Sequence, residues 1–109
     1  MVMTHDMKEC IELCMEAAAA CRSCAVDCRQ MQNMEGCARI CDECADTCDA
    51  TIETMKRGSH ADCANCSTVC DRCAGICDLT DTSFTHDCAK ACRACSEACR
   101  VSAHTPVMQ

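Results

Sequence analysis

The sequence predicts an all-α protein: an antiparallel up-down-up-down four-helix bundle with a cysteine-lined core, formed by a single domain of residues 1–109. Cysteine occurs 18 times and falls into four clusters, within which the spacing alternates between three and four residues. This is the spacing of the inward face of a helix in a bundle. Only three Gly, one Pro and one aromatic residue are present, which disfavours an all-β fold. The 16 alanines favour helix.

The first helix is predicted over about residues 4–32, and Thr4 can cap its start. Its inward positions follow the alternation throughout, and Ala17 stands where one thiol of the pattern is missing. These positions are Met7, Cys10, Cys14, Ala17, Cys21, Cys24, Cys28 and Met31.

The second helix is predicted over about residues 34–57, so almost no linker separates it from the first. We expect Asn33 to end the first helix and cap the second, and Gly58 to stop the second. The two helices then form a tight antiparallel hairpin. The inward positions are Met34, Cys37, Cys41, Cys44, Cys48, Thr51 and Met55.

The third helix is predicted over about residues 60–79. Ser59 is a good N-cap, and Asp62 occupies the capping-box position three residues later. The inward positions are Cys63, Cys66, Cys70, Cys73 and Cys77.

The fourth helix is predicted over about residues 83–103, after the only loop of appreciable length, residues 78–83. Asp81, Thr82 or Ser83 can cap it, and Pro106 prevents it from continuing. The inward positions are Cys88, Cys92, Cys95 and Cys99.

The core of such a bundle is short of large apolar side chains. Leu, Ile, Val and Phe together supply only 12 residues, well below the roughly one-fifth at which a charged chain is suspected of disorder. Helices that meet through Cys and Ala leave an under-filled axis, and voids lower stability. A soft metal bound by sulfur is the natural filler.

Charge and hydropathy exclude several classes of function. The formal net charge is −7, with no basic stripe and no aromatic stacking platform, so nucleic acid is not an expected partner. No apolar run approaches the ~20 residues needed to span a bilayer. The N-terminal sequence lacks the features of an export signal, so we expect a cytoplasmic protein with reduced thiols.

Disulfide staples and iron-sulfur clusters fit this spacing poorly. Cysteines that repeat along one helix face do not direct their Cβ atoms toward each other as a disulfide requires. The stretches 37–44 and 88–95 match the Cys-x3-Cys-x2-Cys spacing of radical-SAM enzymes, but those motifs lie on a loop of a much longer barrel. Bacterial ferredoxin motifs end in a cysteine followed by proline, and no cysteine of this sequence precedes a proline.

Zinc or cadmium storage is the stronger alternative to copper, because two helices can supply four thiolates. Each such site carries a net charge of −2, and several of them in one column accumulate uncompensated charge. Cu(I) accepts two or three sulfurs, and each thiolate can bridge two ions. This leads to about one Cu(I) per cysteine with no change in net charge.

Methionine and histidine side chains at the bundle ends are candidate accessory ligands. One end gathers Met3, His5, Met7, Met55, His60 and His104, and the opposite end gathers Met31, Met34, Phe84 and His86. Thioethers and imidazoles bind Cu(I) more weakly than thiolates, so they could pass ions inward. Because Phe84 makes its end more apolar, we expect metal to enter at the Met7 and His60 end.

The chain resembles the bacterial copper storage proteins, a family of cysteine-lined four-helix bundles. The resemblance covers roughly residues 7–100 and is carried by stretches such as CARICDECADTC (37–48) and HDCAKACRACSEAC (86–99). It implies Cu(I) storage inside the bundle, a homotetramer, and a cytosolic form when no export signal is present. Ala17 departs from the pattern, and His86 stands nearly alone where cytosolic members carry several histidines.

We therefore expect a cytosolic store of many Cu(I) ions with all 18 cysteines as ligands, aided by Met7, Met55, His60, His86 and His104. A copper chaperone or a low-molecular-weight thiol would be the donor or acceptor. No catalytic constellation is recognisable, so an enzyme is not expected. The alternatives are a zinc or cadmium store, and a thiol redox or iron-sulfur electron carrier.

Overall fold

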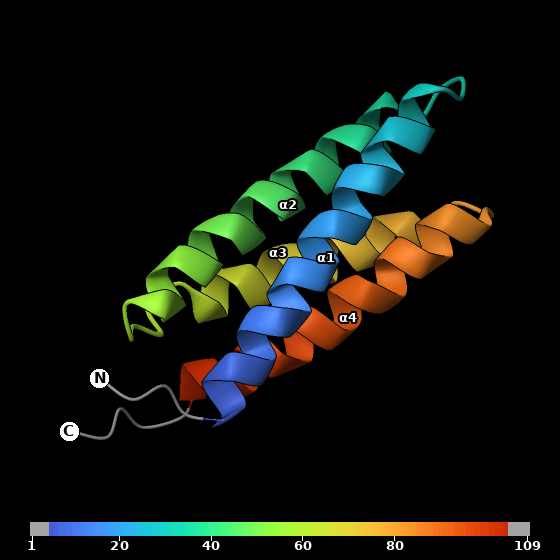
Figure 1. The fold of residues 1–109 in the computed structure, drawn as a ribbon. Coiled ribbons are helices and arrows are strands. Elements are labelled where there is room, and N and C mark those ends of the chain that lie inside the picture. The colour runs from blue at the N-terminus through green and yellow to red at the C-terminus, as the bar shows by residue number, and fades with distance from the viewer. Residues whose placement is uncertain (1–4, 105–109) are drawn as a thin grey trace.

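Four helices make up the molecule in the computed structural model, which describes residues 5–104. They are α1 (His5–Arg29), α2 (Glu35–Lys56), α3 (Cys63–Asp78) and α4 (Ser83–His104). Each helix runs antiparallel to the one before it (Figure 1). The α1–α2 and α3–α4 connections lie at one end of the bundle, here called the far end; α1 begins, α4 ends and α2 joins α3 at the near end (Figure 1). The predicted fold class is confirmed.

The helices form a square bundle that is long and narrow, 51 × 18 × 17 Å. Within the described residues, α1 packs against α2 and α4, and α3 packs against the same two helices. The diagonal pairs meet only through side chains at the axis, as in the 3.9 Å contact between the sulfurs of Cys21 and Cys73. This arrangement turns one face of every helix toward a common axis. The cysteines occupy those faces.

Charged side chains lie on the outside and connect neighbouring helices. These ion pairs link α1 to α2, α2 to α3 and α3 to α4. Their side chains are 36–81% exposed, so each pair contributes at most about 1 kcal/mol. They are Arg22 with Asp46 (3.4 Å) and Asp49 (2.6 Å), Arg29 with Asp42, Arg72 with Glu43, Arg93 with Asp78, and Arg100 with Asp71 (3.4 Å).

The first helix ends at Arg29, three residues before its predicted limit. The amides of Gln30 and Met31 bond to carbonyls only three residues back, at 3.2 and 3.1 Å, which tightens the chain into a turn. Asn33 then adopts a left-handed φ of 65°. Met34, and not Asn33, occupies the N-cap position of α2, so the predicted capping role of Asn33 is wrong.

The end of α2 is closed by a glycine, as the sequence predicts. Gly58 has φ 87°. Its amide bonds to the Met55 carbonyl at 2.9 Å, and the Ser59 amide bonds to the Thr54 carbonyl at 3.1 Å. This pair of bonds is a Schellman motif, which a left-handed residue makes possible.

The start of α3 differs from the prediction. The Ser59 hydroxyl accepts a bond from the Ala61 amide at 3.1 Å and so caps a turn, while the helix begins only at Cys63 with Asp62 as its N-cap residue. Asp62 makes no capping bond, because its carboxylate accepts a 2.5 Å bond from the Thr54 hydroxyl of α2. The segment between Gly58 and Cys63 is therefore a connection and not helix.

Thr82 caps α4, one of the three residues that the sequence offers. Its hydroxyl accepts a bond from the Thr85 amide at 3.2 Å. The fully buried Thr85 hydroxyl donates to the carbonyls of Thr80 and Thr82, each at 3.0 Å. The proposed cap Thr4 of α1 and the stop at Pro106 lie outside the described residues.

Thiols and alanines fill the axis, with Ile11, Ile52 and Val69 among the few larger apolar side chains in the buried cluster. Sulfur atoms of facing helices approach one another at 3.3–4.0 Å, which is ordinary contact. The narrow Cys and Ala faces therefore let the helices come close enough for their sulfur atoms to touch.

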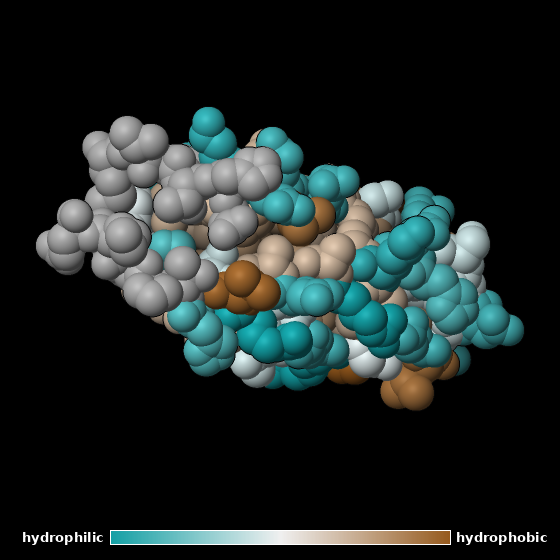
Figure 2. Space-filling view, turned by 90° about the horizontal axis from the view of Figure 1, so that it is seen from below, coloured by the Kyte–Doolittle hydropathy of each residue, from teal (hydrophilic) through white to brown (hydrophobic). Residues whose placement is uncertain are grey.

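Within residues 5–104, every helix is too short or too polar to cross a bilayer. The molecule does have an apolar band on one long side, between rows of hydrophilic side chains (Figure 2). A groove between α1 and α4 is lined there by Leu13, Ala94 and Ala98.

Candidate metal centre

All 18 cysteines are buried, and none of them is in a disulfide. The exposed fraction of the side chain is at most 1% for every cysteine except Cys37, where it is 8%. The cysteines are Cys10, Cys14, Cys21, Cys24 and Cys28 of α1; Cys37, Cys41, Cys44 and Cys48 of α2; Cys63, Cys66, Cys70, Cys73 and Cys77 of α3; and Cys88, Cys92, Cys95 and Cys99 of α4.

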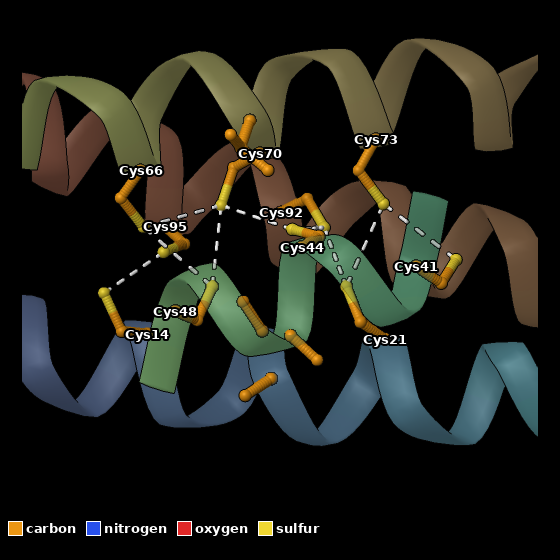
Figure 3. Packing of buried hydrophobic residues seen from close by; sticks show 14 of the residues in the cluster. Cys14, Cys21, Cys41, Cys44, Cys48, Cys66, Cys70, Cys73, Cys92 and Cys95 are labelled. Carbon is orange, nitrogen blue, oxygen red and sulfur yellow. Dashed lines mark hydrogen bonds between the residues drawn. The ribbon is translucent and has the colours of Figure 1, made fainter. Parts of the chain in front are cut away.

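The helix geometry places these thiols in one column along the bundle axis. A side chain that recurs every three or four residues stays on one helix face, and antiparallel packing brings four such faces together. Figure 3 shows sulfurs from all four helices converging between the ribbons. Ala17 is fully buried on the same face of α1, so the column lacks one sulfur at that level.

Short sulfur–sulfur distances occur along the whole column. Near the start of α1, Cys99 lies 3.6 Å from Cys10 and 3.6 Å from Cys14. In the middle, the distance from Cys44 to Cys70 is 3.6 Å. At the far end, Cys77 is 3.9 Å from Cys37.

Four groups of four thiols have all their sulfurs within 4.8 Å of one another. Two groups lie in the half of the bundle nearer the near end and share Cys66 and Cys95; two lie in the other half and share Cys88. A further group of three lies at the far end. The groups are Cys14, Cys66, Cys95 and Cys99; Cys48, Cys66, Cys70 and Cys95; Cys21, Cys73, Cys88 and Cys92; Cys24, Cys41, Cys77 and Cys88; and Cys24, Cys28 and Cys37.

Thiol–thiol hydrogen bonds polarise the column. Bonds from Cys21, Cys73 and Cys77 lower the pKa of Cys41 to about 4, while burial raises the pKa of Cys37 to about 12. A thiolate that accepts several S–H bonds is stabilised at the expense of its donors, whose protons are held. The thiols of the core thus differ in how readily they release their protons.

At the near end, Met7 and Met55 belong to the same buried cluster as Cys10 and Cys63. Met55 is fully buried and Met7 is 4% exposed. His60 is half-buried, and its buried Nδ1 has no hydrogen-bond partner among the described residues. The structure therefore brings two thioethers and one unpaired imidazole nitrogen to this end of the bundle.

The other candidates of the near end are less well placed. His104 ends α4 and is exposed. Met3 and the side chain of His5 lie outside the described residues.

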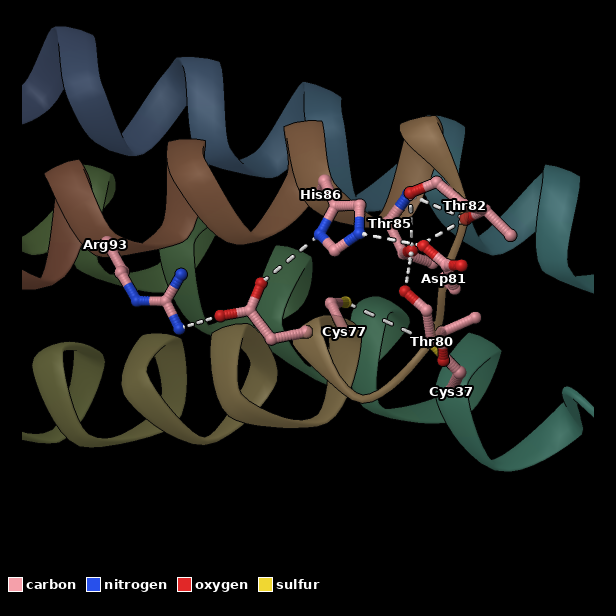
Figure 4. A network of polar contacts seen from close by, with 9 residues as sticks. Cys37, Cys77, Thr80, Asp81, Thr82, Thr85, His86 and Arg93 are labelled. Carbon is pink, nitrogen blue, oxygen red and sulfur yellow. Dashed lines mark hydrogen bonds and ion pairs between the residues drawn. The ribbon is translucent and has the colours of Figure 1, made fainter.

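At the far end, the side chains of His86 and Met31 do not lie where accessory metal ligands were expected. His86 is half exposed, and its ring nitrogens face carboxylates, with Nδ1 3.6 Å from Asp78 and Nε2 3.7 Å from Asp81. Figure 4 shows His86 and Arg93 within this polar network. Arg93 also pairs with Asp78 and lowers the pKa of that carboxyl. The structure thus does not bring His86 to the thiols, and Met31 is 43% exposed.

The sequence reasoning did not identify two buried serines beside the column. The hydroxyls of Ser67 on α3 and Ser96 on α4 are 2.9 Å apart, and Ser96 also donates to the Ser67 carbonyl at 3.1 Å. Each serine directly follows a cysteine, Cys66 or Cys95, that two four-thiol groups share. A small residue directly after an inward cysteine in both α3 and α4 could have predicted that these two helices pack closely.

Comparisons with known proteins agree on one family. A family model described as copper storage protein matches residues 3–104. The apo structure of copper storage protein 3 from Bacillus subtilis is 36% identical with a TM-score of 0.84, and the match covers 88% of this chain and 97% of that chain.

The structure of the Cu(I)-bound copper storage protein BsCsp3 is 33% identical with a TM-score of 0.85, over 91% of this chain and 99% of that chain. A comparison with curated protein sequences finds no match. The family model spans most of the sequence, and the similar structures share the whole bundle. The chain belongs to the copper storage protein family.

Proposed function

We propose that this protein stores Cu(I) ions along its axis, at roughly one ion per cysteine. The observation that carries the proposal is the continuous column of buried, reduced thiols, in which sulfurs of neighbouring helices lie 3.3–4.0 Å apart. Sulfurs at this spacing can each bridge two ions, as Cu(I) clusters require. Membership of the copper storage family supports the same function.

Charge balance favours Cu(I) over divalent metals as the stored ion. Each Cu⁺ that replaces one thiol proton leaves the charge of the column unchanged. A column filled with four-thiolate zinc or cadmium sites would gain two negative charges per site in a buried environment, which is strongly unfavourable. Storage of divalent ions along the whole axis is therefore the weaker alternative.

The proposed role is storage and not catalysis or electron transfer. The thiols are distributed over the whole length of the bundle, and the most exposed of them, Cys37, is only 8% exposed. A redox-active or nucleophilic cysteine needs access to its substrate, which this burial does not provide.

The near end is the proposed entrance. His60 offers an unpaired buried nitrogen, and Met7 and Met55 offer buried thioethers at the same end of the bundle as Cys10 and Cys63. Imidazole and thioether bind Cu(I) less strongly than thiolate does, so an ion captured there is passed inward to the column. His104, Met3 and His5 complete the proposed set at this end.

The proposed partners are a copper chaperone or a low-molecular-weight thiol as donor and acceptor, in the cytoplasm, and further copies of this chain in a homotetramer. The apolar groove between α1 and α4 supports the contact between copies. Leu13 and Ala94 line the groove over its whole length, and charged side chains stand at its margins. A two-fold axis near Leu13 would bring the apolar side chains of two copies together.

Anaerobic titration of the reduced protein with Cu(I) tests the storage function. We expect metal analysis after gel filtration to show about 18 ions per chain, with free thiols decreasing in parallel; the same gel filtration measures the size of the oligomer. A plateau at two or three ions, with most thiols still reactive, would contradict storage.

A further inference from the structure

The four-thiol groups of the metal-free core have a geometry of their own. In the near half, Cys14, Cys66, Cys95 and Cys99 form one of the four-thiol groups. Cys14 is 3.3 Å from Cys95 and 3.6 Å from Cys99, and Cys95 is 3.9 Å from Cys99. Figure 3 shows Cys14, Cys66 and Cys95 directed toward one another from three different helices.

These distances match a tetrahedral thiolate site. Four sulfurs at about 2.3 Å from a zinc ion lie about 3.8 Å from each other, the edge of the tetrahedron. Cadmium takes the same four-thiolate geometry with slightly longer bonds. The group needs only small side-chain movements to close on such an ion.

The far half repeats this arrangement. Cys21 lies 3.9 Å from Cys73, 3.6 Å from Cys88 and 3.4 Å from Cys92, and the four sulfurs are within 4.8 Å of one another. Cys21 and Cys73 come from the diagonal helices α1 and α3, and both others come from α4. The donors again surround a common centre on the axis.

The four-thiol groups overlap, which limits how many ions can bind at once. Both near-half groups use Cys66 and Cys95, and both far-half groups use Cys88. Whichever group is occupied in one half, the second group of that half loses a donor. The three-thiol group Cys24, Cys28 and Cys37 lacks the fourth ligand that a divalent ion takes from thiolates.

We infer that the metal-free protein binds two divalent thiophilic ions, of the Zn²⁺ or Cd²⁺ class, one tetrathiolate site in each half of the column. The inference does not depend on Cu(I) storage. Binding of only two ions per chain also distinguishes this inference from storage of divalent metal along the whole column.

The excess charge of each site is confined to part of its half of the column. Polarisable sulfur atoms surround the ligands there. In the near half, Cys10 lies 3.6 Å from Cys99, and Cys48 and Cys70 each lie 4.0 Å from Cys66.

The far half has the same surroundings. Cys41 lies 3.9 Å from both Cys88 and Cys73, and Cys44 lies 3.8 Å from Cys92. The limit of two ions follows from the donors that the groups share.

Anaerobic titration of the reduced apoprotein with Cd²⁺ tests the inference, because cadmium–thiolate bonds absorb in the near ultraviolet. We expect the absorption to rise linearly and stop at two ions per chain, and metal analysis after gel filtration to retain two. Retention of fewer than two ions, or of three or more, would overturn the inference.

Single substitutions assign the two sites. Cys66→Ser removes a donor from both near-half groups, and Cys88→Ser removes one from both far-half groups, so each variant should retain one Cd²⁺ and the double variant none. Cys63→Ser is the matched control, because Cys63 is equally buried but belongs to none of the four-thiol groups among the described residues; it should retain two.

Circular dichroism of each variant checks that the helices persist, and the wild-type plateau remains decisive if a variant fails to fold. Two ions retained by the Cys66→Ser and Cys88→Ser double variant would overturn the assignment.

The Cu(I) capacity of each single variant should fall by only about one ion, because bridged thiolates act individually. Loss of Cu(I) storage in the wild type would leave the cadmium result unaffected, so the two hypotheses fail separately.

Discussion

The thiols of the core are not equivalent groups. The pKa of Cys41 is lowered to about 4 by bonds from its neighbours, and the pKa of Cys37 is raised to about 12 by burial. Thiols with a raised pKa outnumber those with a lowered one. Raised values are found at Cys14, Cys21, Cys24, Cys37, Cys48, Cys63, Cys70, Cys73, Cys77 and Cys95, and lowered values at Cys10, Cys41, Cys44, Cys66 and Cys88.

This imbalance predicts that the reduced apoprotein becomes less stable in alkali. A thiol such as Cys37, whose pKa rises from 9.0 in the unfolded chain to about 12 in the folded one, stabilises the fold fully below pH 9, and this contribution is lost as the pH rises through 12. Cys41 acts oppositely, and its contribution is lost as the pH falls through 4. We expect the melting temperature, followed anaerobically by circular dichroism, to fall by about 5 °C or more between pH 8 and pH 11.

The Cu(I)-loaded protein is the control for this measurement, because its thiols carry no protons to lose. Its melting temperature should change much less over the same interval. Equal melting temperatures of the apoprotein at pH 8 and pH 11 would show that protonated thiols do not stabilise the core.

Much of this residue-level detail could be predicted from the sequence, but not all of it. The three-and-four spacing predicts which face of each helix is inward, and every cysteine is indeed buried. The same spacing does not give the rotation and relative height of facing helices. The groups around Cys66 and Cys88, and the position of His86 between Asp78 and Asp81, depend on those two quantities.

At the scale of the helices, their ends are set by backbone conformation as much as by capping side chains. Gly58 closes α2 with a left-handed φ, a role that its residue type predicts. Ser59 and Asn33 also look like caps in the sequence but serve turns instead. A hydroxyl or amide side chain identifies a capping candidate, whereas the partner it binds is decided by neighbouring helices, as the Thr54–Asp62 bond shows.

Two glycine substitutions separate these effects. Gly58→Ala places a Cβ in the left-handed region, and we expect it to destabilise the apoprotein by about 1 kcal/mol or more. Gly75→Ala lies in α3, where an added Cβ meets no atom within 4 Å, so it should stabilise the apoprotein by about 0.5–1 kcal/mol. Thermal unfolding should show shifts of opposite sign, each of about 4–8 °C per kcal/mol.

The pair controls for the change from glycine to alanine itself, since both variants add the same methyl group to a glycine. Shifts of the same sign would mean that the Gly58 conformation is not what limits α2. Cu(I) capacity should be unchanged in both variants, because neither glycine belongs to the thiol column.

The molecule as a whole is a narrow store with two chemically different ends. Buried thioethers and the unpaired His60 nitrogen lie at the near end, where the thiol column begins. At the far end, carboxylates hold His86, and Cys37 is the most exposed thiol. The weak ligands favour metal entry at the near end, whereas the exposure of Cys37 favours entry at the far end. The rate of metal uptake can distinguish the two routes.

We predict that replacing Met7 and Met55 by leucine slows Cu(I) uptake and leaves final capacity almost unchanged. Leucine keeps the volume and apolarity of methionine but removes the sulfur, so the bundle should persist. Thiolates dominate the capacity, whereas the thioethers act only on ions that pass the near end. The measurement is the rate of Cu(I) transfer from a competing chelator to the reduced protein.

The matched control is the Met31→Leu and Met34→Leu double variant, which makes the same chemical change at the far end. Met31 is largely exposed and Met34 half-buried, and we expect wild-type uptake. Slower uptake in this variant alone would place the entrance at the far end, where Cys37 would be the first thiol that the metal reaches. Slower uptake in both variants would mean that metal enters from both ends and that the His60 nitrogen does not define a single entrance.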